Sequence, residues 1–488
     1  MRFRVGRDAL GEAVAFVSRA LPSRPVVPVL SGMLLDAGQD GLILSCFDYE
    51  VSARVRVDAE VEEPGTALVP GRLLAEITRS LPASPADFSD ESGMVNLACG
   101  SAEFGLVCLP VGDYPALPES PEPIGTVDSA ALASAIAQVA PAASRDDTLP
   151  MLTAVCLDIS GSVMTLVATD RYRLAARELA FVPSGPDVEA IALVPSRIMT
   201  EVARTMVPGL PLAVALGMEG LVSLEAGGRR LTARLISGEF IKYQARFPTE
   251  FGCCADVPAG PMIEAVRRAA LVAERAGPVQ LSFGAGQVVI EAHAEGRARA
   301  ADTVAAEFSG DQPVISFNPH YLLDGLTAAA SMARPTAALT GSSSSAGSGG
   351  SPSAGGSAVR SKAGGAAGPV EAAGPVEVTG PVEAVGIVEA AGTAKTAKAA
   401  KAAKAAKAAG PVEAADGTNS AGGLAGAAGA GAVVPDAGRI RIQFTSPAKP
   451  ALITWTEETE QAAGADAESA SVPAFRYLLV PLRAPFRA

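Results

Sequence analysis

Two acidic residues are candidates for chemistry, because each follows an apolar stretch and begins a turn. Asp48 and Asp170 lie 122 residues apart in similar local sequences. Two carboxylates can act together as a general acid and base or hold a metal ion, so a metal-dependent hydrolase is one hypothesis. Their equivalent positions favour a second interpretation, in which both are structural turn residues.

Other catalytic signatures are missing from the sequence. His293 and His320 are the only histidines, which is too few for a histidine-rich metal site. Neither standard glycine-rich phosphate loop is present, and no Ser/His/Asp order stands out. We therefore predict a protein that is not an enzyme, with no catalytic residues, no metal and no cofactor.

The cysteines lie mostly in apolar, strand-like sequence and form no Cys-x-x-Cys pair. We predict buried free thiols in a reducing cytoplasm, and the alternative is a redox-active pair formed by the last two. The six cysteines are Cys46, Cys99, Cys108, Cys156, Cys253 and Cys254.

Arginine is the residue type that recurs on predicted helices. The net charge of −13 argues against a protein that coats nucleic acid by bulk attraction, but it permits a local basic surface. Singly, each arginine is typical of a solvated helix face, whereas together they could line one basic concave face. These arginines are Arg7, Arg19, Arg72, Arg79, Arg197, Arg204, Arg267, Arg268 and Arg275.

A repeated stretch organises the elements that carry these residues. Residues 69–77 recur 125 residues later at 194–202, and a looser copy follows after another 124 residues at 317–326. Each copy runs from an apolar strand into a proline near the first helical turn, followed by apolar residues at helical spacing. The aspartate turns keep the same spacing, so the sequence predicts a triplicated domain.

The length agrees with three copies once an insert is removed. The chain has 488 residues, and subtracting the 103 residues of 335–437 leaves 385, or about 128 per copy. We expect domains at 1–122, 123–252 and 253–334 with 438–488, each an α+β unit of two helices on antiparallel sheet with its own core. Helices are predicted at 8–21, around Arg72, and at 129–139, 197–206, 261–275 and 319–330.

The insert at 335–437 has a different composition, rich in Ala, Gly, Pro and Lys. Gly-Pro-Val-Glu recurs from positions 368, 374, 380 and 410, and five lysines follow one another at intervals of three from Lys395 to Lys407. Such a segment has little apolar surface to bury, so we predict a disordered loop. The alternative is a tethered basic arm that touches phosphate.

The N-terminus carries Arg2, Arg4 and Arg7 with no long apolar core, unlike a signal peptide. No run is long and apolar enough to span a membrane. The sequence predicts a cytoplasmic protein with no membrane partner.

Four motifs in order resemble one known family. They are RPVVPVL at 24–30, LPVGDYP at 109–115, ATDRYRL at 168–174 and YLLVPLR at 477–483. They are similar to the bacterial sliding clamp, the β subunit of the DNA polymerase III holoenzyme, and the match covers about 1–334 and 438–488. It departs from the family at 101–103, which lacks basic residues, at 240–243, and in the extension 484–488.

The resemblance implies a DNA clamp fold and a head-to-tail homodimeric ring that encircles double-stranded DNA. It implies a processivity factor that binds the polymerase III catalytic subunit and the clamp loader through short peptides. A specialised paralogue with other partners is the alternative.

The resemblance also implies roles for particular residues. The implied DNA-binding residues are Arg24, Arg72, Arg145 and Arg197. The implied partner-peptide pocket consists of Leu152, Thr169, Tyr172, Arg173, Leu174, Val480, Pro481, Leu482 and Arg483. The implied dimer contacts are Phe104 and Leu106 at one end of the chain and Leu271 and Val272 at the other.

Overall fold

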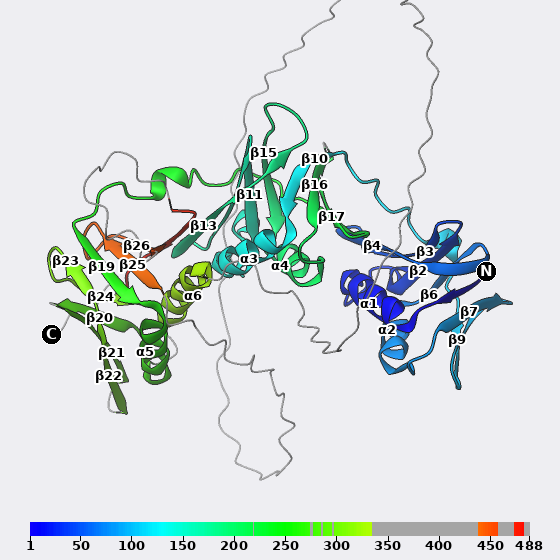
Figure 1. Cartoon of the computed structure of the whole chain (residues 1–488), viewed down its shortest axis with the longest axis horizontal. Helices are drawn as coiled ribbons and strands as arrows, with labels where there is room; N and C mark the ends of the chain where they lie inside the picture. The colour runs from blue at the N-terminus through cyan, green and yellow to red at the C-terminus, as the bar shows by residue number, and fades with distance from the viewer. Residues whose placement is uncertain are drawn as a thin grey trace, which may run out of the picture. The chain divides into compact units, whose positions relative to one another are not determined.

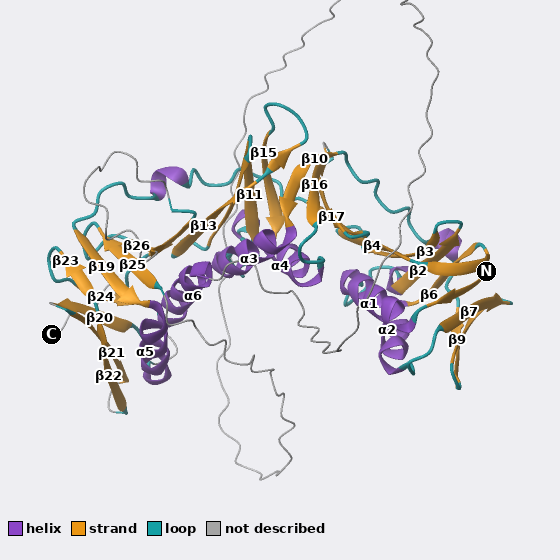
Figure 2. Ribbon diagram, viewed as in Figure 1, coloured by secondary structure: helices purple, strands orange, loops and turns teal. Residues whose placement is uncertain are grey.

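The computed structural model describes residues 1–217, 219–273, 277–284, 286–294, 297–333, 438–456 and 473–482 (Figure 1). The predicted insert at 335–437, Arg275, Arg483 and the extension 484–488 lie outside the described residues. The described parts contain helices packed on antiparallel sheets, as the sequence predicts (Figure 2).

The α-helices of the described residues come in three consecutive pairs. They are α1 (Arg7–Val17), α2 (Gly71–Ser80), α3 (Ser129–Val139), α4 (Ser196–Thr205), α5 (Ala259–Val272) and α6 (Pro319–Ala330). A proline precedes α2 and α4, and side-chain oxygens of Asp128 and Asn318 cap α3 and α6. The first predicted helix is too long, because α1 stops at Val17 and a 3₁₀ turn, Ser18–Ala20, follows.

Two of the sheets contain strands from a single copy, the first copy in one sheet and the third copy in the other. The first runs β5 (Ala59–Glu63), β1 (Arg2–Val5), β7 (Ala86–Glu91), β8 (Met94–Cys99), β9 (Ala102–Val107). The other runs β22 (Ala298–Ala305), β21 (Gln287–Ala294), β20 (Val279–Gly284), β24 (Val314–Phe317). Strands β9 and β22 are therefore edge strands, whose outer backbone groups no described strand pairs.

Two longer sheets each combine strands from neighbouring copies. One runs β14 (Val182–Pro183), β10 (Pro123–Asp128), β16 (Pro211–Gly217), β17 (Leu221–Ala226), β18 (Arg229–Arg234), β4 (Val51–Val57), β3 (Gly41–Phe47), β2 (Gly32–Gly38), β6 (Gly65–Pro70). The other runs β15 (Glu189–Pro195), β11 (Ala154–Ser160), β12 (Val163–Thr169), β13 (Arg173–Ala180), β27 (Phe475–Leu479), β26 (Ala451–Thr456), β25 (Arg439–Phe444), β19 (Cys253–Pro258), β23 (Glu307–Ser309).

The junctions between copies are thus made by backbone pairing. Strand β4 of the first copy pairs with β18 of the second, and β13 of the second pairs with β27 of the third. One buried apolar cluster runs through residues of all three copies. The expectation that each copy has its own separate core is therefore wrong, because edge strands that would otherwise face water pair with each other and join the sheets.

A second, smaller cluster covers the other face of the β11–β13 sheet. Buried Cys156, Leu174 and Leu478 pack there against Tyr243, and Ile241 and Phe247 from the same connecting segment lie on them. The Tyr243 hydroxyl donates a hydrogen bond of 2.7 Å to Asp158 Oδ2, which holds this segment on the sheet.

The two candidate catalytic aspartates have the same structural role. Asp48 Oδ1 accepts from the backbone N–H groups of Glu50 and Val51 at 3.0 and 2.7 Å. Asp170 Oδ1 accepts from those of Tyr172 and Arg173, both at 3.0 Å. The interpretation as turn residues is confirmed, because these bonds close the same turn in two copies.

Gly325 is the point where α6 packs most closely on its sheet. A Cβ there would lie 2.6 Å from ring carbons of Tyr477, whose side chain is 1% exposed. Only glycine lets the helix approach this ring so closely.

We predict that Gly325→Ala destabilises the protein by about 1–3 kcal/mol, because the added methyl group overpacks a locked ring. Gly11 in the middle of α1 is the matched control, since nothing lies within 4 Å of a Cβ there. Gly11→Ala should stabilise by about 0.5–1 kcal/mol through helix propensity alone. Urea denaturation measures both, and equal shifts of the same sign would contradict the packing argument.

Candidate functional site

Arginines from two copies meet at a cavity of about 550 Å³ between the first and second copies. Arg24 and Arg197 both line it, and both side chains are exposed. Across the same junction Arg19 donates to Glu201 at 2.8 Å. Arg24 and Arg197 themselves form no ion pair with any residue that the structure describes, so their charges are available to a ligand.

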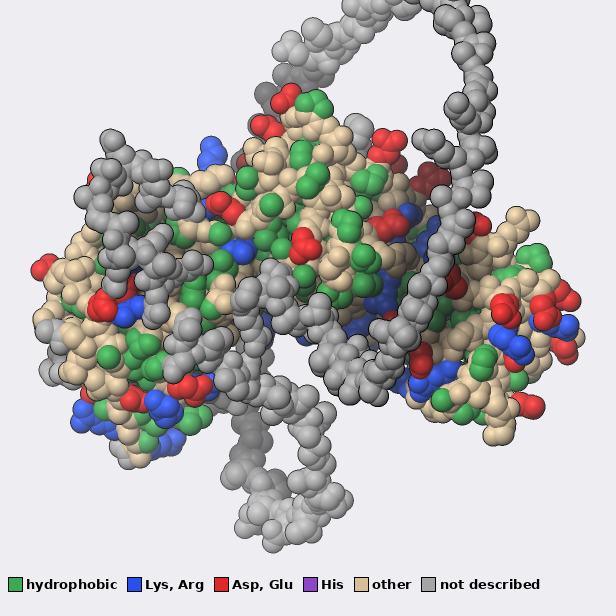
Figure 3. Space-filling view, viewed as in Figure 1, with side chains coloured by type: hydrophobic (Ala, Val, Ile, Leu, Met, Phe, Trp, Pro, Cys, Tyr) green, Lys and Arg blue, Asp and Glu red, His purple; other side chains and the backbone are tan. Residues whose placement is uncertain are grey.

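A larger cavity of about 1120 Å³ lies beside α3 and α4, and Arg197 lines it too. Arg145 lies on its wall in the loop after α3, so the structure brings together three of the four implied DNA-binding residues. Figure 3 shows Lys and Arg side chains gathering over the region of α1 and α4. The four arginines on the wall, Arg145, Arg197, Arg204 and Arg234, outnumber the two acids, Glu50 and Asp147.

Arg72 lines neither of these cavities. It is exposed on the first turn of α2, and its Nη2 donates a 2.8 Å hydrogen bond to the carbonyl of Pro22. This bond fastens the segment before Arg24 to α2. The repeat that relates α2 to α4 predicts that Arg72 is exposed, but it does not predict the contact with Pro22.

An apolar pocket of about 540 Å³, which we call the partner pocket, lies where the second and third copies meet. Its wall contains five of the implied residues, Leu152, Thr169, Arg173, Leu174 and Val480. Tyr172, Pro481 and Leu482 do not line it. Tyr172 is 53% exposed on the adjacent turn, and the backbone N–H of Leu482 donates to the Ser316 carbonyl at 2.7 Å. Arg483 lies outside the described residues.

Five members of the partner pocket wall were not predicted, namely Arg171, Ala245, Arg246, Pro450 and Leu478. Ile241 lines the wall too, and it belongs to 240–243, which the resemblance implies to lie at the pocket rim. Ile241 through Arg246 belong to the connecting segment that packs on the sheet, and the alternation of apolar residues around Tyr243 was the available signal. Pro450 carried no signal, because only the strand pairing of β26 with β27 places it here.

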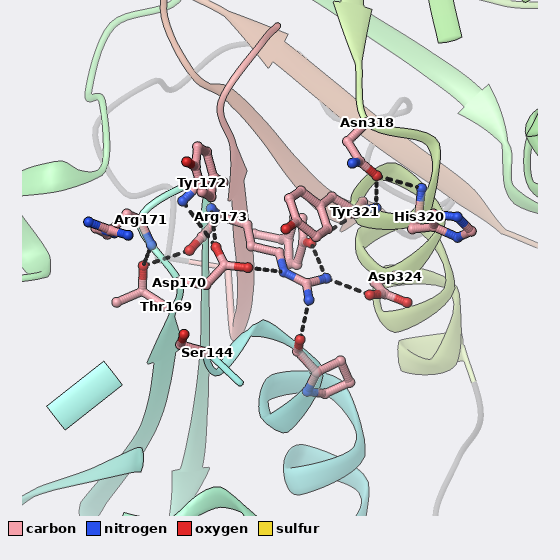
Figure 4. A network of polar contacts seen from close by, with 12 residues as sticks. Ser144, Thr169, Asp170, Arg171, Tyr172, Arg173, Asn318, His320, Tyr321 and Asp324 are labelled. Atoms are coloured by element: carbon pink, nitrogen blue, oxygen red, sulfur yellow. Dashed lines mark hydrogen bonds and ion pairs between the residues drawn. The ribbon is translucent and has the colours of Figure 1, made fainter. Parts of the chain in front are cut away.

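Arg173 joins four parts of the chain at the wall of this pocket: the turn before β13, the segment at Pro141, α6 and β27 (Figure 4). Its Nε donates to Asp170 at 3.1 Å, and its two terminal nitrogens donate to Asp324 of α6 and to the carbonyl of Pro141. Its guanidinium also lies 4.2 Å from the centre of the Tyr321 ring. The side chain is 9% exposed, so these partners replace nearly all of its water.

Tyr477 closes the network from β27. Burial raises the pKa of its hydroxyl above the usual range, so the group is neutral. The hydroxyl donates to the Tyr321 carbonyl at 2.8 Å and accepts from Arg173 at 3.4 Å. The second and third copies are therefore held together at one buried, charged centre.

A further cavity of about 780 Å³, which we call the adjoining cavity, shares Arg171 and Arg173 with the partner pocket. Tyr172, Tyr321 and His320 line it on the α6 side, and Arg145 lines it on the other. The turn after β12 thus separates two hollows, of which the partner pocket is the more apolar.

The implied dimer residues differ in exposure. Leu271 at the end of α5 is 84% exposed, whereas Phe104 and Val272 are half-buried. Leu106 is fully buried in its own chain, which the sequence did not anticipate, and Val107 is the exposed apolar residue of β9 at 66%. The alternation of a half-buried strand explains this.

All six cysteines are free thiols in the described chain, as predicted, but Cys108 and Cys254 are half-buried rather than buried. Burial and the nearby Asp256 raise the pKa of Cys254 to about 11, so its thiolate is scarce at neutral pH. No group of three His, Cys, Asp or Glu residues within the described ranges is placed to hold a metal ion. Among those residues, no helix is long and apolar enough to cross a membrane.

We predict that Arg173→Gln lowers the free energy of unfolding by about 3–5 kcal/mol, because it leaves Asp170, 11% exposed, without its cation. Asp324→Asn is the matched variant at the other end of the network. Asp324 is 42% exposed, so its loss should cost only about 1 kcal/mol. Urea denaturation distinguishes the two, and equally small losses would contradict the central role of Arg173.

Solved structures show the same fold. A DNA polymerase sliding clamp from Bacillus subtilis is similar with a TM-score of 0.69 and 20% identity, over 99% of this chain and 100% of that one. A DnaN sliding clamp from Pseudomonas aeruginosa, solved bound to griselimycin, has the same TM-score and 21% identity, over the same shares of the two chains.

Sequence relatives are closer. The chain is 49% identical to the beta sliding clamp of Streptomyces coelicolor over 349 residues, covering 71% of this chain and 92% of that protein. It is 44% identical to the beta sliding clamp homolog GriR of Streptomyces muensis over 67% of this chain and 88% of that protein. The models of the N-terminal, central and C-terminal domains of the DNA polymerase III beta subunit match residues 1–118, 126–242 and 244–346. The chain therefore belongs to the β sliding clamp family, the non-catalytic β subunits of DNA polymerase III that act in DNA replication.

Proposed function

We propose that two copies of this chain close head to tail into a ring around duplex DNA and hold the polymerase III catalytic subunit and the clamp loader by short peptides. The proposal that the chain binds DNA rests on the cavity beside α3 and α4. In a chain of net charge −13, four arginines gather on its wall against two acids. A local positive charge attracts phosphate even when the whole molecule is acidic.

The proposed phosphate contacts are Arg24, Arg72, Arg145 and Arg197. We add Arg234 and Arg204, because both line the same cavity as Arg145 and Arg197, although Arg204 also lies 3.4 Å from Glu201. Exposed arginines that touch phosphates position a protein on DNA without reading its sequence. Such contacts exchange readily with counterions, so they permit sliding. A closed ring stays on the DNA by topology and does not require tight binding.

Ring closure fits two of the sheet edges that the structure describes. Strands β9 and β22 are edge strands in different sheets and belong to the first and third copies. A head-to-tail dimer needs complementary, unlike ends on each chain, and pairing β9 of one chain with β22 of another would supply them. We propose Phe104, Val107, Leu271 and Val272 as apolar contacts there, with Leu106 supporting them from the core.

The partner pocket fits a short apolar peptide. Side chains of Leu152, Leu174 and Leu478 line it, and each is 5–7% exposed, so the wall is preformed. A pocket that takes one or two large side chains is an ordinary way to bind a peptide tail. We also propose the domain boundaries 1–122, 123–252 and 253–334 with 438–488, and a cytoplasmic location.

We expect the protein, once loaded on nicked circular DNA by a clamp loader, to stay on the circle and to leave when the circle is linearised. The loss follows from topology, because a ring slides off an open end. Gel filtration of labelled protein with DNA before and after cutting measures it. Equal retention on both forms would show an ordinary DNA-binding protein instead.

Arg145→Gln with Arg197→Gln should lower the slope of log K against log salt for direct DNA binding by about 2, or about 1 per arginine. The control Arg2→Gln removes an exposed charge from β1, outside both arginine-lined cavities. Its slope should match that of the unchanged protein.

Leu271→Asp should raise the dissociation constant of the dimer about thirtyfold, which corresponds to about 2 kcal/mol at an interface centre. Val182→Asp is the matched control, since Val182 is 66% exposed on β14, which belongs to a different sheet from both β9 and β22. Analytical ultracentrifugation measures both variants. A wild-type protein that is monomeric at micromolar concentration would contradict the ring.

A specialised paralogue is the second candidate, and the 44% identity to the clamp homolog GriR favours keeping it. Its fold and dimer would be the same, but its partners would differ. A polymerase-tail peptide that fails to bind while the dimer persists would support it.

A further inference from the structure

Strand β15 lies at one end of a nine-stranded sheet, where β11 pairs with one of its sides and no described strand pairs with the other (Figure 1). The strand has seven residues, Glu189–Pro195, and the glutamate is its only charged residue. Proteins usually protect such an edge with charges, prolines, short length or a covering segment, because its free backbone groups can pair with another strand. An edge that lacks this protection is a candidate site for an added strand.

The three copies cover the corresponding edge strand in the same way, at one carbonyl. The backbone N–H groups that do this come from the segment after each copy's sheets, and the bonds are Leu109 to Leu68, Ile236 to Leu193 and Leu482 to Ser316, at 2.7, 2.9 and 2.7 Å. Backbone groups two residues apart on a strand point to the same side. The residues two positions before the covered carbonyl therefore also direct their N–H and C=O groups to the free edge, and they are Thr66, Ile191 and Val314.

The first and third copies protect this position, whereas the second does not. Pro64 lies at the next outward position before Thr66, and Pro313 directly precedes Val314 in front of a strand of only four residues. Proline has no N–H for an added strand to use. No proline precedes Ile191 within β15, and its side chain is 69% exposed. The second copy therefore presents an apolar, accessible edge that its two relatives in the chain do not.

The side chains of this edge line a cavity of about 700 Å³, which we call the β15 cavity. Glu189 and Ile191 line it from β15, and Val163 of β12, which is 41% exposed, lines it from the sheet. The strand register places Asp158 of β11 next to Ile191 on the same face. An added strand would thus meet an apolar surface with carboxylates beside it.

The charge on the wall of the β15 cavity is mainly negative. The wall contains Asp158, Glu178 and Glu189 against one cation, Arg476. Glu178 pairs with Arg476 at 2.8 Å, and Asp158 accepts a hydrogen bond from the neutral hydroxyl of Tyr243. Glu189 forms no ion pair within the described part of the chain. This surface is complementary to a basic partner, and it would repel a second copy of itself.

We propose that β15 docks an extended, basic segment of a partner protein, which pairs with the free edge at Glu189–Ile191 and adds a strand to the sheet. In an antiparallel pairing, the residue opposite Ile191 is apolar, and the residue two positions later, opposite Glu189, is Lys or Arg. Main-chain hydrogen bonds provide affinity, and the alternate side chains provide specificity. The β15 cavity shares no residue with the partner pocket or the arginine-lined cavities, so this proposal is independent of those sites.

The probe is the end-blocked hexapeptide Thr-Thr-Val-Thr-Lys-Thr, titrated to millimolar concentration against the full-length protein. Amide hydrogen exchange followed by mass spectrometry measures the protection of fragments that contain residues 189–192. The outward N–H groups of Glu189 and Ile191 exchange quickly in the free protein and should be protected by the probe. A peptide with Glu in place of Lys should bind about tenfold more weakly, because an attractive cross-strand pair becomes repulsive. Thr-Thr-Val-Lys-Thr-Thr has the same composition but directs Lys to the other face, and it should also bind more weakly.

Ile191→Pro removes the outward N–H and should abolish the protection. It leaves the pairing of β15 with β11, because the N–H of Ile191 points away from that strand. Ile191→Thr keeps the N–H but loses the apolar contact, so it should weaken binding about fivefold, and it decides the test if the proline variant does not fold. Val314→Thr is the matched control at the corresponding position of the third copy, and it should bind the probe as the unchanged protein does. Thermal unfolding shows whether each variant is folded.

Several results would overturn the proposal. They are no protection of residues 189–192 at millimolar probe, protection confined to the partner pocket, protection that survives in folded Ile191→Pro, and binding to Ile191→Thr as tight as to Val314→Thr. Equal binding of the Lys and Glu peptides would refute the assigned basic partner. If raising the protein concentration alone protects residues 189–192, and Ile191→Pro removes this effect, a second copy occupies the edge and the proposal fails.

Discussion

The buried guanidinium of Arg173 is the interaction on which the junction of the second and third copies depends. Removing such a group from water is costly unless every donor finds a partner. Asp170, Asp324, Tyr477 and the Pro141 carbonyl supply these partners from separate segments. The network forms only when β13, β27 and α6 are all in place, so it couples the strand pairing to the partner pocket beside it.

The corresponding turn of the first copy carries no equivalent of Arg173. Its equivalent turn has Asp48 in the position of Asp170, with the same two backbone hydrogen bonds. The residue that corresponds to Arg173 is Val51, which is 7% exposed and apolar. The β4–β18 junction is held by backbone pairing, apolar packing and ion pairs with more exposed partners, Arg19–Glu201 and Arg229–Glu12. The same turn thus presents an apolar side chain to the core in the first copy and a buried arginine to several charged and polar partners in the second.

The positive charge of the chain is concentrated at two cavities, although the chain as a whole is acidic. The acids exceed the bases over the whole chain, yet the cavities beside α3 and α4 and between the first two copies carry Arg24, Arg145 and Arg197, which form no ion pair with any residue that the structure describes. Arg197 belongs to both cavities, so the basic surface continues across the first junction. Weak, replaceable contacts on such a surface suit a protein that must remain on DNA while moving along it.

The sequence alone determined the triplication, the six helices, four of them to within about three residues, and the turn role of Asp48 and Asp170, because these depend on local periodicity and repeated spacing. It did not determine that the sheets join across copies, that Leu106 is buried, or that Arg171, Arg246 and Pro450 meet at one pocket. Those features depend on which free edges pair, and edge pairing joins residues about 300 positions apart, such as Arg173 and Leu479. Strand edges pair through backbone hydrogen bonds, which are the same for every residue type, so the sequence pattern does not show which edges pair. Only the tertiary structure shows this.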